Sequence, residues 1–448
     1  MLVLPGAYDS LENYSDDLST FIDSPLVRQI TGGIHVNDAL ICDAWNNLPS
    51  DWTQWWLSQS DYRLVQQDLI DSVDDKSHHA MDIRPSSLTN WLNTMRSLAL
   101  PRDQRAGSSI TLPGVLIARM KTKKIAEISR AVAYVYDQCK RKSITHIVEM
   151  GSGQGYLSVS LAYLFPNLRI LAIDGSESQI EGSRAFAASL GIPEHRLEHM
   201  FAWIDMSSSL ADKVNEWIGG NKCMLVGLHA CGSLSEHILR YFTTMSSIKA
   251  LAVVGCCFNH IVPLSPTCPE GFPISLAMRK RNVILSPTAL MTGCQAPGNW
   301  TRPDLSNNKS IYSKRRLYRA VLEKLFHDKG IEVGDAGKRP VWGIRKGDLD
   351  SFTAYAHRAM DCLGIDGDRV SIAELESYEE LYKDYEGHIA ILWTLSIICS
   401  KVVESVIAID RYLFLVEQGM KGVDVIPIFD FKISPRNLMI VAEKGETR

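Results

Sequence analysis

The stretch Glu149-Met150-Gly151-Ser152-Gly153-Gln154-Gly155 decides the fold, because it stands where an apolar run gives way to a helical pattern. The run from Ile144 to Met150 is short, apolar and closed by glycine, which predicts a buried strand. Residues 155–165 then have the pattern of a helix. Glycines at this junction allow a tight turn and let a ligand approach the backbone, since no Cβ stands in the way. The stretch therefore predicts a ligand-binding loop at the carboxyl end of a strand.

The chain on either side of this loop alternates between strand and helix patterns. Further strands are predicted at 168–173, 197–202, 222–228 and 250–255, with helices at 122–139, 178–190 and 233–242. Strands that alternate with helices predict an α/β protein with a parallel, Rossmann-like sheet covered on both faces. Near the end of the chain, a long helix over 388–418 precedes strands at 423–429 and 437–442. These last strands predict an antiparallel hairpin at the edge of the same sheet.

Two regions do not follow the alternation. Residues 1–105 have helical patterns and are rich in tryptophan, and we predict a separate helical N-terminal region. Residues 106–448 then form the α/β domain, with 258–386 as a long insertion between the fifth strand and the last helix. The polar stretch 71–87 predicts an exposed loop.

Composition excludes several protein classes. Of 448 residues, 46% are hydrophobic, which excludes a wholly disordered chain. The net charge of −4 excludes a protein that grips nucleic acid by bulk charge, although residues 101–150 and 271–320 are locally basic. The best candidate for a membrane span, the apolar run from His388 to Ser400, is shorter than the roughly 20 residues that a span needs, so no membrane is expected. Ten cysteines without a secretory signal predict reduced thiols in a cytoplasmic or nuclear protein.

The glycine loop has the spacing G-x-G-x-G, with an acid two residues before the first glycine. That arrangement looks like the cofactor loop of S-adenosylmethionine-dependent methyltransferases, in which Glu149 would face the cationic methionine end. Asp174 closes the second strand 23 residues after Gly151, where a carboxylate can accept both ribose hydroxyls. Asp205 follows the third strand and is predicted to reach the adenine amino group. The competing interpretation is a glycine-rich turn in a Rossmann domain that holds another ligand or none.

Two further segments follow strands four and five, at the edge where ligands of such sheets bind. They are His229-Ala230-Cys231-Gly232 and Cys256-Cys257-Phe258-Asn259-His260. His229 or His260 is a candidate general base, and Cys257 could shape the pocket or react. The bland alternatives are a histidine that only satisfies a backbone carbonyl and a small buried cysteine at Cys256. Zinc is the less favoured interpretation because no spaced C-x-x-C pair exists, so we expect no metal.

At these residues the chain resembles the methyltransferase-like protein 25 family, also described as ribosomal RNA adenine dimethylase domain-containing proteins. The matching segments are 120–124, 149–157, 227–232, 255–259, 271–273 and 426–437, the last with the specific run Ser434-Pro435-Arg436-Asn437. The resemblance runs from about Trp45 to the C-terminus. It implies a class I methyltransferase fold with a cofactor site at Gly151, Gly153, Gly155 and Asp174.

The resemblance also bears on the methyl acceptor. Adenine dimethylases carry Asn-Leu-Pro-Tyr or a similar run after strand four, where this chain has Leu228-His229-Ala230-Cys231. The segments 229–232 and 256–257 are also similar to those of tRNA acceptor-stem 2′-O-methyltransferases. We expect Lys123, Lys124, Arg436 and Asn437 to contact the substrate.

These observations predict an S-adenosylmethionine-dependent methyltransferase that acts on a macromolecule, either RNA or protein. The alternative is a non-catalytic protein that uses the same fold as a scaffold, with the tryptophan-rich region 1–105 as its partner surface. The sequence leaves the oligomeric state open.

Overall fold

The computed structural model of this protein describes residues 2–33, 36–73, 84–297, 311–334, 343, 345 and 347–445. The chain forms two compact units, each made of segments far apart in the sequence. Met1–Ile22, Ser97–Leu285 and Lys401–Arg448 form the sheet unit, and Asp23–Arg96 with Ser286–Ser400 form the helical unit. The boundaries predicted above, 1–105 and 258–386, follow the chain, whereas each unit here combines separate segments. The predicted loop at 71–87 lies largely outside the described residues.

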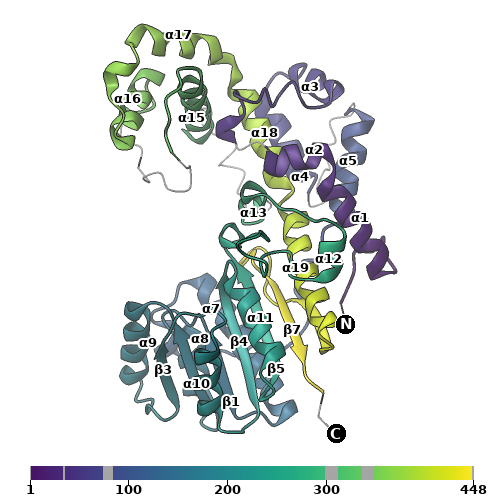
Figure 1. The fold of residues 1–448 in the computed structure, drawn as a ribbon, viewed down its shortest axis with the longest axis vertical. Helices are drawn as coiled ribbons and strands as arrows, with labels where there is room; N and C mark the ends of the chain where they lie inside the picture. The colour runs from purple at the N-terminus through teal and green to yellow at the C-terminus, as the bar shows by residue number, and fades with distance from the viewer. Residues whose placement is uncertain are drawn as a thin grey trace. The chain divides into compact units, whose positions relative to one another are not determined.

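A seven-stranded sheet is the centre of the sheet unit, in the order β3-β2-β1-β4-β5-β7-β6 (Figure 1). Its strands are β1 His146–Met150, β2 Arg169–Asp174, β3 Leu197–Phe201, β4 Cys223–Cys231, β5 Ile248–Cys256, β6 Lys421–Pro427 and β7 Leu438–Glu443. The first five strands run parallel, and β7 runs antiparallel to both β5 and β6. This order confirms the predicted class I methyltransferase sheet, including the C-terminal hairpin.

Strand β4 is longer than predicted, because its register with β5 shifts between Leu228 and Ala230. Pairing resumes after the irregularity, and Cys231 comes to lie opposite Cys256. His229, within the irregularity, has a φ of 65°. An irregularity of this kind at a strand end re-aims a side chain and is common beside functional sites.

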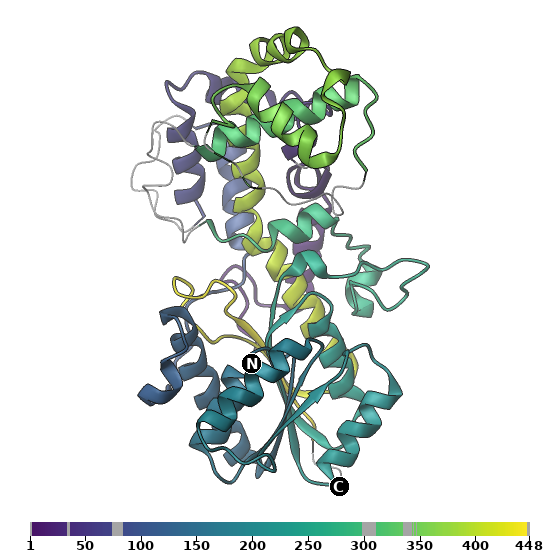
Figure 2. The ribbon, with the colours of Figure 1, turned by 90° about the vertical axis from the view of Figure 1, so that its left-hand side faces the viewer.

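Helices cover both faces of the sheet (Figure 2). Helices α7, α8 and α9 pack against one another in series, and α11 packs on β4 and β5. The α-helices of this unit are α1 Leu11–Asp23, α6 Gly114–Ile117, α7 Thr122–Lys142, α8 Tyr156–Leu164, α9 Glu177–Ser189, α10 Ser208–Ile218, α11 Leu234–Thr244, α12 Leu276–Lys280 and α19 Ser400–Glu417, with a 3₁₀ turn at Phe258–His260. Helix α7 buries Ile128, Val132 and Val135 in the core beside the sheet, as its apolar spacing predicts. Every residue of β1 is buried, so the strand places its glycine loop on a rigid support.

The helical unit contains α2 Pro25–Arg28, α3 Ser50–Leu57, α4 Tyr62–Asp71, α5 Ser86–Ser97, α13 Pro287–Thr292, α15 Ile311–Asp328, α16 Phe352–Leu363, α17 Ile372–Tyr382 and α18 Glu386–Ile398. Short turns of other helix types lie at Gln29–Gly33, Val36–Asp38, Gly367–Arg369 and Lys383–Tyr385. Its tryptophans pack inside it: the rings of Trp52 and Trp56 lie 5.9 Å apart, and those of Trp52 and Trp91 lie 5.4 Å apart. Trp45, Trp52 and Trp56 are buried. These indoles are part of the hydrophobic core of the unit, which argues against the alternative in which they form a surface for binding a partner.

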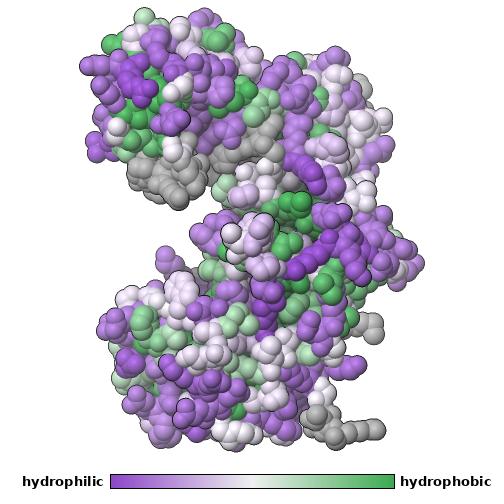
Figure 3. Space-filling view, in the orientation of Figure 1, coloured by the Kyte–Doolittle hydropathy of each residue, from purple (hydrophilic) through white to green (hydrophobic). Residues whose placement is uncertain are grey.

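The predicted helix over 388–418 is two helices, since α18 ends at Ile398 and α19 begins at Ser400. The stretch Ile372–Glu417 is long and apolar enough, by length and composition, to cross a membrane, and 78% of its apolar window is buried. Core helices of globular proteins meet the same criteria, so this is weak evidence for a span. On the face drawn in Figure 3, hydrophobic residues form small groups among hydrophilic ones.

Candidate active site

The glycine loop lies at the carboxyl end of β1, as predicted, and is tied to the end of β2. Gly151, Gly153 and Gly155 all have left-handed φ values, between 52° and 78°. The backbone N–H of Gly153 donates to Asp174 Oδ2 at 2.8 Å, and the N–H of Ser176 donates to Asp174 Oδ1 at 2.9 Å. A carboxylate has about four acceptor sites, so Asp174 keeps acceptor capacity on both oxygens. It can therefore hold the loop and accept two hydroxyl groups of a ligand.

Glu149 is buried and turned toward helix α8. Its carboxylate accepts hydrogen bonds from the backbone N–H of Ser158, at 3.0 Å, and from the Ser158 hydroxyl. Burial raises the pKa of Glu149 to about 7, although both Ser158 contacts oppose the rise. The carboxylate thus joins the end of β1 to the first turn of α8, where a negative charge is favourable. Its predicted contact with the methionine end of the cofactor stays a prediction.

Trp203, which our sequence analysis missed, lies beside the end of β2. Its side chain is 75% exposed, and a Cβ placed on Gly175 would lie 2.7 Å from its ring. Gly175 therefore lets the indole pack directly against the backbone next to Asp174. An exposed aromatic face at this position could stack on a flat ring. The available signal was an aromatic residue just after the third strand, two residues before Asp205.

Asp205, two residues after Trp203, is exposed. The N–H of Ser207 donates to its Oδ1 at 3.0 Å, and this backbone hydrogen bond lowers the pKa of Asp205. Asp205 also lines a cavity of about 460 Å³ with Ser233 and Arg240. The glycine loop and Asp174 do not line that cavity. The position of the loop, and not the cavity, therefore indicates where a cofactor would bind.

His229 is paired with Glu127, a buried carboxylate of α7. His229 Nε2 lies 3.0 Å from Glu127 Oε2, and the Ser434 hydroxyl donates to Glu127 Oε1 at 2.7 Å. Lys124 Nζ lies 3.0 Å from Oε2 and Lys123 Nζ lies 3.7 Å from Oε1. Burial alone would raise the pKa of Glu127, but the hydrogen bond and charge of His229, the Lys124 charge and Ser434 outweigh it and lower the pKa to about 2. Glu127 is therefore ionised and fixes the orientation of the imidazole.

This arrangement unites predicted residues from distant parts of the sequence. The candidate base His229 and two predicted substrate lysines, Lys123 and Lys124, share one carboxylate, which the sequence analysis did not identify. The side chain of Lys123 is 51% exposed, so an anionic ligand beside His229 has access to it. The only sequence signal for Glu127 was its spacing of three and four residues from the two lysines.

Arg436 and Asn437, also predicted to contact substrate, are buried in the loop after β6. Asn437 Nδ2 donates to the backbone carbonyls of Arg102, at 2.9 Å, and Phe429, at 3.1 Å. Arg436 lies 3.0 Å from Glu404, which also pairs with Arg102 at 2.8 Å. Asn437 has no exposed surface, so any influence on a substrate would act by holding this loop. Contact with a substrate stays a prediction for both residues.

Three thiols meet at the ends of β4 and β5. The Sγ atoms of Cys231 and Cys256 are 3.3 Å apart, those of Cys256 and Cys257 are 3.6 Å apart, and all three lie within 4.8 Å of one another. Cys257 has a φ of 46°, a strained conformation for a residue with a Cβ. Among the described residues, this cluster has the donor atoms and spacing to hold a thiophilic metal ion. His260 is exposed, and its ring lies 3.2 Å from the Asn259 amide.

The pKa values of two thiols in this cluster shift in opposite directions, that of Cys231 downward and that of Cys256 upward. The hydrogen bond from Cys256 lowers the pKa of Cys231 to about 6, with further lowering from Cys257 and from the charges of His229 and His260. The same hydrogen bond and burial raise the pKa of Cys256. Cys231 is exposed, so we predict that Cys231 carries the reactive thiolate, whereas the sequence analysis named Cys257 as the thiol that could react.

This assignment predicts a pH profile for alkylation. The rate of iodoacetamide reaction at Cys231, followed by peptide mass spectrometry, should reach half its plateau near pH 6, because the thiolate forms as pH rises through the pKa. The exposed Cys42, whose pKa burial raises, serves as the internal control and should react only at higher pH. Replacing Cys256 with alanine removes the hydrogen bond and should move the Cys231 profile upward. A Cys231 profile centred between pH 8 and 9 in the unchanged protein would contradict the assignment.

Comparisons with known proteins agree with this geometry. A family model described as a methyltransferase domain matches residues 120–263, which include the glycine loop, Asp174, Glu127 and His229. The chain is 25% identical over 297 residues to a mouse protein named probable methyltransferase-like protein 25, covering 62% of this chain and 48% of that protein. The human protein of the same name is 26% identical over 254 residues, covering 55% and 40%. The chain is thus similar to the methyltransferase-like protein 25 family. It spans about half the length of these relatives.

Solved structures with similarity to this chain include methyltransferases. Coclaurine N-methyltransferase, bound to N-methylheliamine and S-adenosylhomocysteine, covers 95% of this chain and 100% of its own, with 12% identity and a TM-score of 0.26. The plantazolicin methyltransferase in complex with S-adenosylhomocysteine covers 50% and 66%, with 14% identity and a TM-score of 0.23. These scores are too low to carry an argument. The fold of this methyltransferase-like protein 25 relative rests on its own strand order.

Proposed function

We propose that this protein is an S-adenosylmethionine-dependent methyltransferase that acts on a macromolecule, RNA or protein. The observation that carries the proposal is the attachment of the glycine loop to Asp174, at 2.8 Å, at the carboxyl ends of adjacent strands β1 and β2. Such a loop leaves backbone N–H groups and a carboxylate for a nucleoside ligand. The loop has the spacing G-x-G-x-G and lacks the G-x-G-x-x-G spacing that suits the pyrophosphate of a dinucleotide, which favours S-adenosylmethionine as the cofactor.

The residues around this site would divide the work. Gly151, Gly153 and Gly155 would hold the cofactor, Asp174 its ribose and Trp203 or Asp205 its adenine. The cofactor would supply an activated methyl group. His229, oriented by Glu127, would accept a proton from the acceptor, because its pair resembles the histidine–carboxylate arrangement of general-base enzymes.

The choice of a macromolecular acceptor rests on charge. Lys123 and Lys124 lie at Glu127 beside His229, two cations against one carboxylate, and favour an anionic partner. A protein acceptor fits the same site if an acidic segment flanks the modified residue. The direct test is mass spectrometry of RNA nucleosides and protein digests from cells with and without the gene. A methyl mark that disappears with the gene and returns with the natural chain supports the proposal.

A complementation experiment distinguishes this proposal from the alternative of a non-catalytic scaffold protein. Cells that carry Asp174→Ala in place of the natural chain should lose the mark if the protein is an enzyme. Full restoration of phenotype and mark by this variant would favour the scaffold.

Cofactor binding gives a further prediction. Asp174→Ala should weaken S-adenosylmethionine binding by about 1–3 kcal/mol, because two ribose hydroxyls and the Gly153 N–H lose their acceptor. Isothermal titration calorimetry measures this change, with Glu177→Gln, an exposed carboxylate three residues further along, as the control. Unchanged affinity in a folded Asp174→Ala protein would remove Asp174 from the site.

A further inference from the structure

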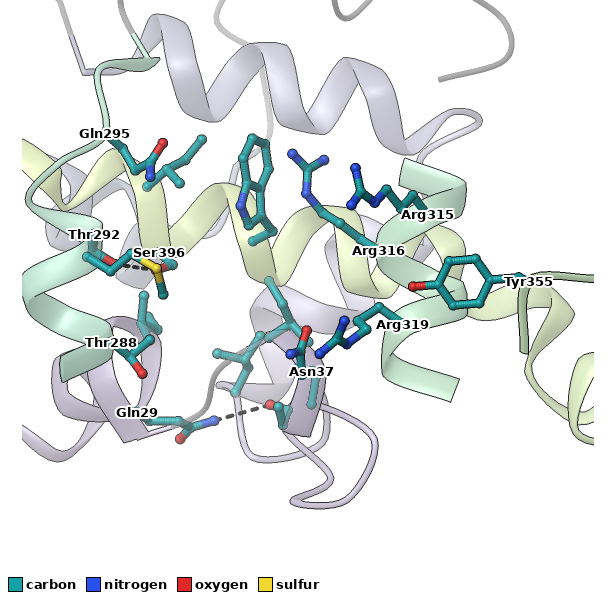
Figure 4. Close-up of a pocket in the computed structure, with 18 residues that line it drawn as sticks. Gln29, Asn37, Thr288, Thr292, Gln295, Arg315, Arg316, Arg319, Tyr355 and Ser396 are labelled. Atoms are coloured by element: carbon teal, nitrogen blue, oxygen red, sulfur yellow. Dashed lines mark hydrogen bonds between the residues drawn. The ribbon is translucent and has the colours of Figure 1, made fainter. Parts of the chain in front are cut away.

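The helical unit contains a cavity of about 470 Å³ that the proposed function does not use. Figure 4 shows its two sides: Arg315, Arg316 and Arg319 of α15 extend from one side, and Thr288 and Thr292 of α13 lie on the other. All of its lining residues belong to the helical unit. Its volume is within the range of small-molecule sites.

The charge of this cavity is one-sided. Three guanidinium groups line it, and none of its lining residues within the described part of the chain is Asp or Glu. Glu323, outside the lining, accepts from Arg319 Nε at 3.0 Å and offsets part of this positive charge. Like charges gathered around a cavity repel one another, and an anion in the cavity removes that cost. The cavity therefore favours an anionic ligand.

One guanidinium is held in place by an aromatic ring. Arg316 Cζ lies 3.3 Å from the centroid of the Trp393 ring, in van der Waals contact with its face. Stacking of this kind fixes the plane of the guanidinium. A fixed guanidinium loses little entropy when it binds phosphate through two parallel hydrogen bonds. Burial raises the pKa of Tyr355, and the nearby positive charges of Arg319 and Arg315 partly oppose this rise.

The opposite side is polar and uncharged. Thr292 Oγ1 lies 2.9 Å from Ser396 Oγ, and Thr288 and Gln295 line the same side. Hydroxyl and amide groups recognise the hydroxyls of a sugar and do not require a second charge. Together, the two sides fit a phosphomonoester on one half of the ligand and a hydroxylated ring on the other.

We propose that this cavity binds a ribose phosphate group, as a free nucleotide or as the 5′-phosphorylated end of an RNA. A phosphomonoester carries a charge of about −1.5 to −2 at neutral pH, which matches the arginine side. The site is separate from the glycine loop, so its test does not depend on methyl transfer.

The experiment uses the full chain and calorimetry with AMP, UMP and inorganic phosphate, in the presence of saturating S-adenosylhomocysteine to occupy the cofactor site. One saturable site per chain for a nucleotide is expected. Arg315→Gln and Arg319→Gln should each weaken it roughly 10- to 100-fold, the range for a charge-assisted hydrogen bond. Arg369→Gln, an exposed arginine of the same unit outside the cavity, is the matched control and should leave the affinity unchanged.

RNA tetramers with and without a 5′-phosphate separate the two sources. Tighter binding of the phosphorylated tetramer than of AMP supports an RNA end, and the reverse supports a free nucleotide. Equal affinity for AMP and inorganic phosphate would overturn the ribose assignment. Tighter binding of a phosphoserine peptide, no binding of any phosphate, or nucleotide binding that survives Arg315→Gln and Arg319→Gln in folded protein would overturn the site.

Discussion

Replacing His229 with alanine is expected to lower turnover by about 10²- to 10⁴-fold at saturating cofactor, with cofactor affinity nearly unchanged. The reason is the pair that His229 forms with the buried, ionised Glu127, 3.0 Å away, which orients the ring at the end of β4. Single-turnover kinetics with methyl-labelled cofactor and the acceptor found in cells measures the effect.

Two variants sharpen this test. Glu127→Gln keeps the shape of the side chain and removes the charge, so the imidazole remains in place but becomes a weaker base and the rate should fall by less than in His229→Ala. His195→Ala changes an exposed histidine in the turn before β3 and should have no effect. If His229→Ala lowers cofactor affinity and melting temperature but leaves the rate at saturation intact, His229 is a structural residue.

Deleting the chain after Gly419 is expected to unfold the sheet unit. The deletion removes β6 and β7, and β7 pairs with β5 along Ala250 to Val254, whose side chains are almost completely buried. Exposing this strand edge and its apolar face costs more than the 5–15 kcal/mol by which a domain of this size is typically stable. Loss of the cooperative melting transition and aggregation during expression are the expected results.

A chain that ends at Gly445 is the control, because it keeps both strands and should melt like the full protein. The outcome that contradicts this prediction is a soluble 1–419 fragment that binds S-adenosylmethionine. Such a fragment would show that the first five strands form a stable sheet without the hairpin.

The parts of this fold that depend on local sequence could be predicted. Glycine spacing placed the loop at the end of β1, and the alternation of patterns gave all seven strands. The break between α18 and α19 could not be predicted, because Cys399 has helical dihedrals and no proline or glycine marks it. The association of Asp23–Arg96 with Ser286–Ser400 in one unit could not be predicted either. It depends on contacts between segments that lie far apart in the sequence.

In the candidate site, too, the sequence predicted single residues but not which residues pair with one another. His229 was predicted from its place after a strand, but Glu127 lies 102 residues earlier, in a helix whose periodicity gives no hint of a buried carboxylate. Cys231 and Cys256 became partners only through the register shift in β4. In both cases the missing information is tertiary: which side chain of one element faces the end of another.

The position of β7 has a consequence for how the protein is made. This strand lies between β5 and β6 in the sheet but comes last in sequence among the seven strands, so a ribosome completes β5 long before its neighbour exists. At 5–20 residues per second, β5 waits roughly 10 to 40 s with one edge open. A nascent chain in that state is a natural client for chaperones, and a premature stop codon anywhere between β5 and β7 would leave it there permanently. Nonsense alleles that stop translation before β7 should therefore behave as complete losses of the protein.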